Sequence, residues 1–155
     1  MKRLLLLIIP IASLLSGCQK YIGIRNQTLS RHNWKMTEHL ENGIDVLKDC
    51  EKDDTYYFYG NQSGKVDEGN NICDSTIVVG SQGQDSIVAM HQLDFGWSVT
   101  GDQKIIYLYH FGDPNYNPGW TILDMDETKF HIKGIDQRNG ITITYYKTFE
   151  AINNL

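Results

Sequence analysis

From residue 31 onward, the chain is a series of short segments in which apolar and polar side chains alternate, separated by turn sequences. The clearest case is the pair of segments 129–136 and 141–149, which flank Arg138-Asn139-Gly140. A period of two residues is typical of a half-buried β-strand, and an Asn-Gly dipeptide accepts the positive φ angles of a tight hairpin turn. The pattern therefore predicts an all-β domain.

Two further turn sequences, Asn42-Gly43 and Gly101-Asp102, join neighbouring segments in the same way. Residues 60–74 are rich in Gly, Asn, Asp and Ser, so we expect a loop there, with at most a short strand near Lys65 and Val66. In chain order, the predicted strands are 33–41, 44–48, 55–59, 75–79, 85–93, 94–100, 104–111, 120–125, 129–136 and 141–149.

About eight to ten short strands joined mostly by tight turns form a meander, and no helical pattern of about 10 residues follows the N-terminal segment. A meander avoids exposed edge strands by closing on itself. We therefore expect a single antiparallel up-and-down β-barrel of about eight strands. A β-sandwich is the alternative.

The first 17 residues are typical of an export signal. Lys2 and Arg3 form a basic start, and an almost wholly apolar run of 12 residues follows over 4–15. This run is too short for a membrane-spanning helix, which needs about 20 residues. It fits the apolar region of a signal peptide, which does not belong to the folded domain.

The ending of this segment, Leu15-Ser16-Gly17-Cys18, resembles the lipobox of bacterial lipoproteins. In that family a diacylglycerol is attached to the cysteine, and signal peptidase II cleaves just before it. The resemblance implies a signal peptide over 1–17 and a lipid on Cys18 that anchors the protein to a membrane. Residues 18–30 are then expected to form a lipidated tether, and residues 31–155 the barrel domain.

The residue after Cys18 is Gln19. In the sorting rule of enteric lipoproteins, Asp at that position retains a protein at the inner membrane, so the resemblance favours the outer membrane. No acidic run of the kind that directs some lipoproteins to the cell surface follows Cys18. We therefore expect an outer-membrane lipoprotein that faces the periplasm.

The acidic balance of the chain argues against a nucleic-acid partner. Removal of Lys2 and Arg3 would change the formal charge from -5 to -7, because 12 basic residues would then face 19 acidic ones. Affinity for nucleic acids comes mostly from neutralising phosphates. The 138 residues that would remain are enough for one domain with a single core.

The other two cysteines, Cys50 and Cys73, are expected to pair as a disulfide in an oxidising compartment. Such a bond closes a loop of about 24 residues and stabilises the fold by around 3 kcal/mol on the chain-entropy model. Metal binding and redox catalysis are the alternatives. Both are disfavoured, because the chain has no Cys-x-x-Cys and no histidine within a few residues of either cysteine.

Taken together, these features resemble the lipocalin-like domain of small Gram-negative lipoproteins. The resemblance covers residues 31–149 and departs from the classical Gly-x-Trp of lipocalins, since His32 stands at the glycine position. It implies the barrel but not the details of lipocalin ligand chemistry. The matching features are the early strand with Trp34 and Met36, the pair Cys50 and Cys73, DDTYYFYGNQSG, WSVTGDQKIIYL over 97–108, and ITITYY.

A barrel of about eight strands is filled by side chains or holds one small ligand, and both interpretations stay open. The first functional hypothesis is a non-catalytic module that binds a small apolar or amphipathic ligand, with loops 60–74 and 112–119 at the rim. The residues expected to face the interior are Trp34, Met36, Tyr56, Phe58, Trp97, Tyr107, Tyr109, Phe130, Ile132, Ile143 and Tyr145. Of these, all but Ile132 and Ile143 are the predicted ligand-binding residues.

The second hypothesis is an envelope protein-interaction or inhibitor module, whose protein partner the sequence does not name. Tyr116 and Trp120 flank Asn117-Pro118-Gly119, and exposed aromatic residues are common anchors of interfaces. Burial of Trp120 by the following strand would weaken this hypothesis.

We expect no enzyme, cofactor or metal. The chain has no Gly-x-Ser-x-Gly and no phosphate-binding glycine loop, and its carboxylates do not follow a calcium-loop pattern. On the alternating pattern, His39 shares the outer face with Lys35. Only His91 and His110 could meet across facing strands, with Asp113 nearby. The five histidines, His32, His39, His91, His110 and His131, are scattered along the chain.

Overall fold

The computed structural model describes residues 23–73, 75–79, 85–89, 92–111 and 114–152. The predicted signal peptide over 1–17 and the predicted lipid site at Cys18 lie outside these residues. His91 and Asp113 lie outside them too, so the suggested meeting of His91 with His110 stays a prediction.

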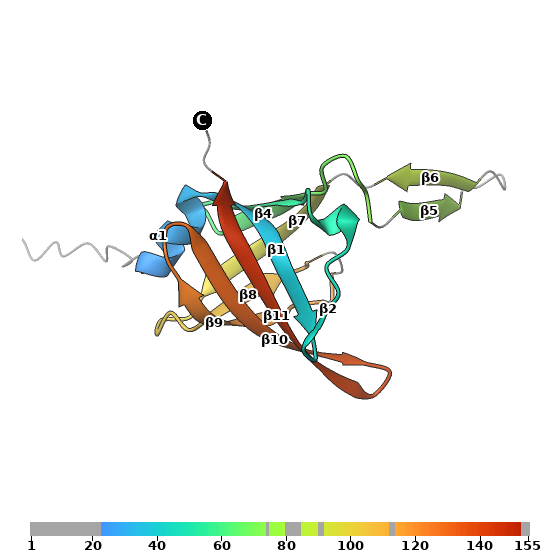
Figure 1. Cartoon of the computed structure of the whole chain (residues 1–155). Coiled ribbons are helices and arrows are strands. Elements are labelled where there is room, and N and C mark those ends of the chain that lie inside the picture. The colour runs from blue at the N-terminus through green and yellow to red at the C-terminus, as the bar shows by residue number, and fades with distance from the viewer. Residues whose placement is uncertain (1–22, 74, 80–84, 90–91, 112–113, 153–155) are drawn as a thin grey trace, which may run out of the picture.

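The described residues form mostly β-strands, together with a short α-helix and a single turn of 3-10 helix (Figure 1). The elements, in chain order, are α1 Ile24–Arg31, β1 Asn33–Glu41, β2 Ile44–Asp45, η1 Asp49–Glu51, β3 Thr55–Phe58, β4 Ser63–Asp67, β5 Ser75–Val79, β6 Asp85–Ala89, β7 Gln92–Val99, β8 Ile105–Tyr109, β9 Gly119–Met125, β10 Lys129–Arg138 and β11 Ile141–Ile152.

Within the described part of the chain, eight strands close into an antiparallel barrel. Hydrogen-bonded neighbours follow the order β1, β3, β4, β7, β8, β9, β10 and β11, and β11 pairs back onto β1. Among the described strands, β2 pairs with the end of β1 and with no other. The predicted up-and-down barrel is therefore confirmed over the alternative β-sandwich.

Two of the predicted hairpin turns have the backbone geometry that their sequences require. Asn42 and Gly43, between β1 and β2, have φ angles of 49° and 86°. Asn139 and Gly140, between β10 and β11, have φ angles of 53° and 78°. Positive φ at both central residues matches the twist of the flanking strands, so each Asn-Gly pair sets the register of its hairpin.

The segment 60–74, predicted as a loop with at most a short strand near Lys65 and Val66, contains the five-residue barrel strand β4 at that place. Its composition concealed the full extent of the strand, because Gly64 takes an inward position that most strands fill with an apolar side chain. A Cβ atom at Gly64 would overlap the ring of Phe95, which fills that space from β7. The predicted strand over 85–93 is likewise two strands, since β6 ends at Ala89 and β7 begins at Gln92.

Strands β5 and β6 pair with each other and, among the described residues, with no barrel strand. They form an arm that projects from the barrel between β4 and β7 (Figure 1).

The inward face of β8 differs from the prediction. Tyr107 and Tyr109 point outward and are each 40% exposed, whereas Ile106 and Leu108 are fully buried. The run Ile-Ile-Tyr-Leu-Tyr offers apolar side chains on both faces, so alternation alone does not select one. Pairing with β7 decides it, because Leu108 lies opposite the buried Trp97.

A second correction concerns β1. The register of β1 against β11 shifts between Met36 and Glu38, which marks a β-bulge. A bulge adds one residue to one strand and reverses the alternation beyond it. Trp34 and Met36 therefore face inward as predicted, but His39 is also buried and does not share the outer face with Lys35.

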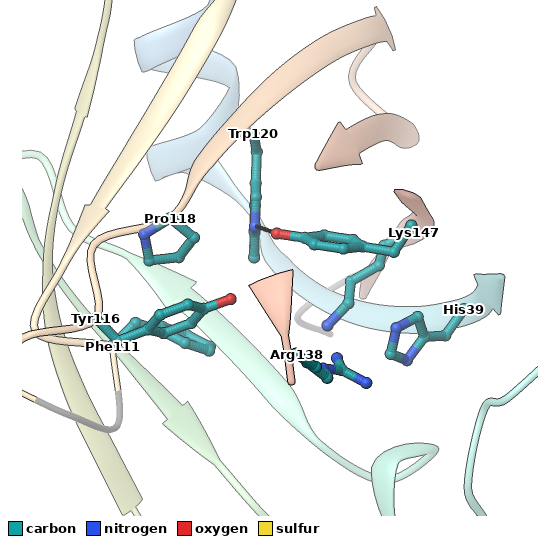
Figure 2. Close-up of a pocket in the computed structure, with 8 residues that line it drawn as sticks. His39, Phe111, Tyr116, Pro118, Trp120, Arg138 and Lys147 are labelled. Carbon is teal, nitrogen blue, oxygen red and sulfur yellow. Dashed lines mark hydrogen bonds between the residues drawn. The ribbon is translucent and has the colours of Figure 1, made fainter. Parts of the chain in front are cut away.

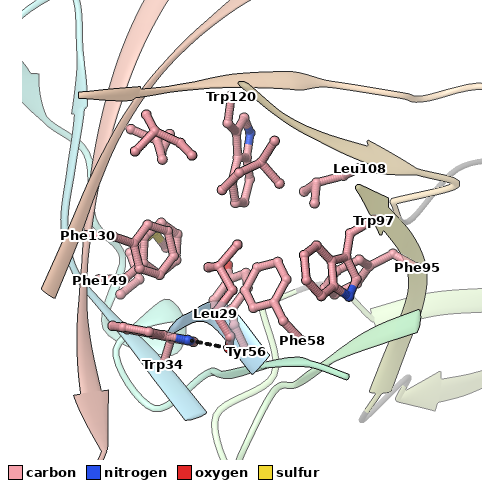
Figure 3. Close-up of a cluster of buried hydrophobic side chains, with 14 of the residues drawn as sticks. Leu29, Trp34, Tyr56, Phe58, Phe95, Trp97, Leu108, Trp120, Phe130 and Phe149 are labelled. Atoms are coloured by element: carbon pink, nitrogen blue, oxygen red, sulfur yellow. Dashed lines mark hydrogen bonds between the residues drawn. The ribbon is translucent and has the colours of Figure 1, made fainter. Parts of the chain in front are cut away.

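The barrel interior is filled by interlocking aromatic rings (Figure 3). Phe130 and Phe149 stack with ring centroids 4.4 Å apart, and Trp34 meets Phe130 edge to face at 4.7 Å. Of the residues predicted to face the interior, Ile143 is only half-buried. Those that are buried as predicted are Trp34, Met36, Tyr56, Phe58, Trp97, Phe130, Ile132 and Tyr145.

Helix α1 closes one end of the barrel. Leu29 is fully buried against the core, and Trp34 donates a hydrogen bond from Nε1 to the Leu29 carbonyl at 3.0 Å. The side chains of Gln103 and Glu127, from the turns after β7 and β9, contact α1 and the residue that follows it. The chain from residue 24 therefore belongs to the barrel domain and not to the tether predicted over 18–30.

No α-helix among the described residues is long and apolar enough to span a membrane.

The predicted disulfide between Cys50 and Cys73 is present. It joins η1 to the segment that follows β4, and so holds the chain between β2 and β3 against the barrel. Both cysteines lie at the end of the barrel opposite α1.

Candidate functional site

A small pocket lies at the open end of the barrel. Because neighbouring strands are antiparallel, the turns that contact α1 lie at one end, and the β8–β9 loop and the β10–β11 hairpin lie at the other. Between these two connections is a cavity of about 50 Å³ (Figure 2). Its lining residues are His39, Phe111, Tyr116, Pro118, Trp120, Arg138, Tyr145 and Lys147.

The floor of this pocket is a hydrogen-bonded aromatic pair. Trp120 on β9 donates from Nε1 to the hydroxyl oxygen of Tyr145 on β11 at 3.1 Å, and both residues are buried. The far face of Trp120 stacks on Phe149, with ring centroids 5.7 Å apart. The pocket is therefore separated from the rest of the barrel interior by packed rings.

The volume sets what the pocket can hold. At about 50 Å³, the cavity is far smaller than the roughly 300–1,000 Å³ of a typical ligand site, so it admits one end of a molecule and not the whole of it. The rest of a larger molecule would lie outside, against Phe111, Tyr116 and Pro118 at the rim. The packing of Trp34, Phe58 and Phe130 fills the interior, which agrees with the interpretation of these residues as core and not with a ligand held inside the barrel.

Lys147 is the most unusual group in the pocket. It lies on β11 between Tyr145 and Phe149, at an inward position of the alternating pattern, and its side chain extends into the pocket (Figure 2). The ammonium lies 5.9 Å from the ring centroid of Trp120 and 5.8 Å from that of Tyr145. Burial lowers its pKa, although the carboxylates of Glu51 and Glu41 oppose the shift.

Arg138, at the end of β10, is held by carboxylates. Its Nη2 and Nη1 contact Glu41 Oε1 and Oε2 at 2.8 and 3.1 Å, and its Nε donates to Asp136 Oδ2 at 2.9 Å. These hydrogen bonds raise its pKa. The guanidinium therefore forms a fixed side of the pocket whose positive charge is already neutralised.

His39 and Glu51 form the side of the pocket next to η1. Nδ1 of His39 lies 3.8 Å from Glu51 Oε1, and Nε2 lies 3.7 Å from Glu41 Oε1. Glu51 Oε2 accepts a hydrogen bond from the backbone N–H of Lys48 at 2.9 Å. Glu51 thus has a partner at the start of η1, and Glu41 has its partner in Arg138 at the end of β10.

Asp54 lies just beyond this side, between η1 and β3, and is buried. Burial raises the pKa of its carboxyl to about 7, and the negative charges of Glu68 and Glu51 add to the effect. The group therefore titrates near neutral pH, so the negative charge beside the pocket grows as the pH rises through 7.

The structure brings few of the predicted ligand-binding residues to this pocket. Tyr145 lines it, and the predicted rim loop 112–119 contributes Tyr116 and Pro118, whereas no described residue of 60–74 lines it. Trp34, Met36, Tyr56, Phe58, Trp97 and Phe130 lie in the core, and Tyr107 and Tyr109 lie on the outer face.

Sequence reasoning missed His39, Arg138 and Lys147. The bulge concealed His39, and Arg138 was assigned to a turn. Lys147 could have been identified from the sequence, because it is a charged residue two positions from Tyr145 on the strand face predicted to point inward. Charged residues almost never lie inward without a partner or a function.

The pocket offers donors and aromatic surfaces and no metal site. Among the described residues, no three His, Cys, Asp or Glu side chains are grouped to hold a metal ion. This arrangement can bind a small polar group reversibly. Compared with protein-family models and with curated proteins, the chain matches none.

Proposed function

We propose that this protein is a lipid-anchored, non-catalytic binding protein of the bacterial cell envelope, related to lipocalin-like lipoproteins, that takes up a small amphipathic molecule at the open end of its barrel. The observation that carries the proposal is the pocket floored by Trp120 and Tyr145, into which Lys147 extends. Ligand sites are typically concave and mostly apolar, with a few polar groups that orient the ligand.

The molecule binds with its polar end first. The pocket accepts one small polar group, and the packed rings below prevent deeper entry. The apolar part of the ligand lies across Phe111, Pro118 and Tyr116. This differs from a ligand buried in a hollow barrel, and it places the site at the rim instead of in the core.

The anchor is a lipid on Cys18, and the outer membrane, on its periplasmic side, is the proposed location. Helix α1 begins at Ile24, so only residues 19–23 separate the helix from Cys18. Five residues reach at most about 18 Å even when fully extended. A short tether at the α1 end supports an orientation in which the barrel lies close to the membrane with its pocket directed away from it.

Metabolic labelling with radioactive palmitate tests the anchor. The wild-type protein incorporates label and sediments with membranes, and Cys18→Ser incorporates none. Equal labelling of the two would contradict lipidation at this residue.

A second candidate function is protein binding, and a different surface favours it. Tyr59, Tyr107 and Tyr109 lie on the outer face and are each about 40% exposed. Trp120, which the sequence offered as an exposed anchor, is buried, so an interface would use these tyrosines instead.

Native mass spectrometry of the protein extracted from its own envelope separates the two functions. A retained small molecule that is lost in a Trp120→Ala variant, while Tyr107→Ala keeps it, supports the ligand site. Absence of any retained molecule, together with a co-purifying protein that Tyr107→Ala releases, overturns the ligand proposal in favour of the partner.

A further inference from the structure

We infer that the polar end of the bound molecule is a carboxylate and that Lys147 is the residue that recognises it. The inference rests on the proposed ligand site and names the chemical class of its ligand: a small monocarboxylate with an apolar tail.

The first support is the position of the Lys147 ammonium. This group has three N–H donors and no acceptor capacity. Among the described residues, it has no hydrogen bond and no ion pair, and its contacts are the ring faces of Trp120 and Tyr145. Lys147 is half-buried, so its ammonium is partly removed from water without a protein acceptor, and a ligand that supplies the acceptor offsets this cost.

The second support is that the neighbouring charges are already paired. Arg138 makes three contacts with Glu41 and Asp136, so its donors are engaged. Glu51 accepts from the backbone of Lys48. Among the described residues that line the pocket, Lys147 is thus the cation whose N–H donors are not engaged by a carboxylate.

The third support is a second donor beside Lys147. The hydroxyl of Tyr145 accepts the hydrogen bond from Trp120 and donates its own proton to Tyr116, which leaves the proton of the Tyr116 hydroxyl to donate. A carboxylate has two oxygens, one for the Lys147 ammonium and one for the Tyr116 hydroxyl. An alcohol offers a single oxygen and no charge, so it makes the weaker contact.

Charge favours a carboxylate over a phosphate. The carboxylates of Glu41, Glu51 and Asp54 lie around the pocket and repel a doubly charged group more than a singly charged one. A monocarboxylate meets the least repulsion from these groups and can still accept hydrogen bonds from the Lys147 ammonium.

The test compares chain-matched probes on the purified full-length protein. Octanoate, octanol and octylamine share one tail and differ only in the polar end. Binding is measured by the change in tryptophan fluorescence and by calorimetry. We expect octanoate to bind about tenfold more tightly than octanol, and octylamine to bind more weakly than either.

Lys147→Met removes the ammonium but keeps a similar side-chain length. In this variant we expect the affinity for octanoate to fall about tenfold, to that of octanol, while octanol binding is unchanged. Lys104→Met, which changes an exposed lysine at the α1 end, keeps the wild-type preference. Lys147→Gln is a second variant that removes the charge but keeps a polar side chain. Circular dichroism of both variants shows whether a loss of binding occurs while the fold is retained.

The outcomes are distinct. Equal binding of the three probes to the wild type, or an unchanged octanoate preference in Lys147→Met, overturns the carboxylate inference and leaves the amphiphile site standing. Binding of none of the probes, with the fold intact and no small molecule retained from the envelope, overturns the proposed ligand site itself.

Discussion

Trp120 and Tyr145, on strands separated by β10, are joined by a buried hydrogen bond of 3.1 Å from the indole N–H to the phenol oxygen. The bond ties β9 to β11 across the barrel interior. It also separates two environments, since a packed apolar core lies on one side and a charged pocket on the other. The stability of the barrel and the shape of the pocket therefore depend on the same pair.

Replacement of Tyr145 by Phe tests this pair. The substitution leaves a buried indole N–H without its acceptor, which costs about 1–3 kcal/mol of unfolding free energy. Urea denaturation measures the loss. The control is Tyr107→Phe on the exposed face of β8, for which the expected change is within about 0.5 kcal/mol. Equal stability of the two variants would show that the bond contributes nothing.

Gly134→Ala tests how tightly Tyr145 is held. Gly134 lies opposite Tyr145 in the β10–β11 pairing, and a Cβ atom there would overlap the phenol ring. The ring would have to move, at a cost of about 1–3 kcal/mol. Gly101→Ala is the control, because no atom lies within 4 Å of its added Cβ. Thermal unfolding that is the same for both variants would argue that the ring relocates freely.

Leu29→Ala tests whether α1 is an integral cap of the barrel. Leu29 is fully buried, and its truncation is expected to cost about 2–5 kcal/mol. Ile24→Ala on the same helix removes a side chain that is 68% exposed, so it should be nearly neutral. If both variants unfold like the wild type, the helix is dispensable.

The disulfide between Cys50 and Cys73 is expected to stabilise the fold by about 3 kcal/mol. The double variant Cys50→Ser with Cys73→Ser should lose this amount in chemical denaturation. Addition of a reductant should reproduce the loss in the wild type and leave the double variant unchanged. A reductant effect of equal size on both proteins would have another origin.

Asp54→Asn tests the charge beside the pocket through pH. Burial raises the pKa of Asp54 to about 7 in the folded protein, against 3.8 as its ordinary value. Between these pH values the folded state keeps a proton that the unfolded state releases, so this carboxyl lowers stability as the pH rises from about 4 to about 7. Relative to the wild type, the variant should therefore gain roughly 3 kcal/mol from pH 4.5 to pH 8.

Denaturation at several pH values checks this gain, and a stability difference that does not vary with pH would contradict the assigned pKa. NMR titration gives an independent check through Lys147, whose positive charge lowers the Asp54 pKa. In Lys147→Met, the Asp54 titration should therefore move to higher pH.

Much of the barrel was predictable because its strands and turns depend on residues that are close together in the sequence. Alternation placed β10 and β11, and Asn139-Gly140 carries the turn chemistry that joins them. The pairing of Cys50 with Cys73 followed from export chemistry and an even number of remaining cysteines. These inferences needed only the geometry of neighbouring residues.

Other features depended on contacts between distant parts of the chain. The inward face of β8 follows from its pairing with β7, since both faces of its sequence are apolar. The sequence indicated at most a short strand near Lys65 and Val66, and the full extent of β4 is recognisable only once Phe95 fills the space beside Gly64. His39 reaches the pocket because a bulge forms where β1 meets β11.

The sequence by itself determined that the chain forms a closed meander of strands with an aromatic interior, because strand period and turn chemistry act over a few residues. Only the tertiary structure decided that this interior is filled and that Lys147, Tyr145 and Trp120 meet in a small pocket at its open end. The physical reason is that the space left inside the barrel depends on the register between strands and on how side chains from opposite strands pack together. The alternation of residues along one strand carries no information about either.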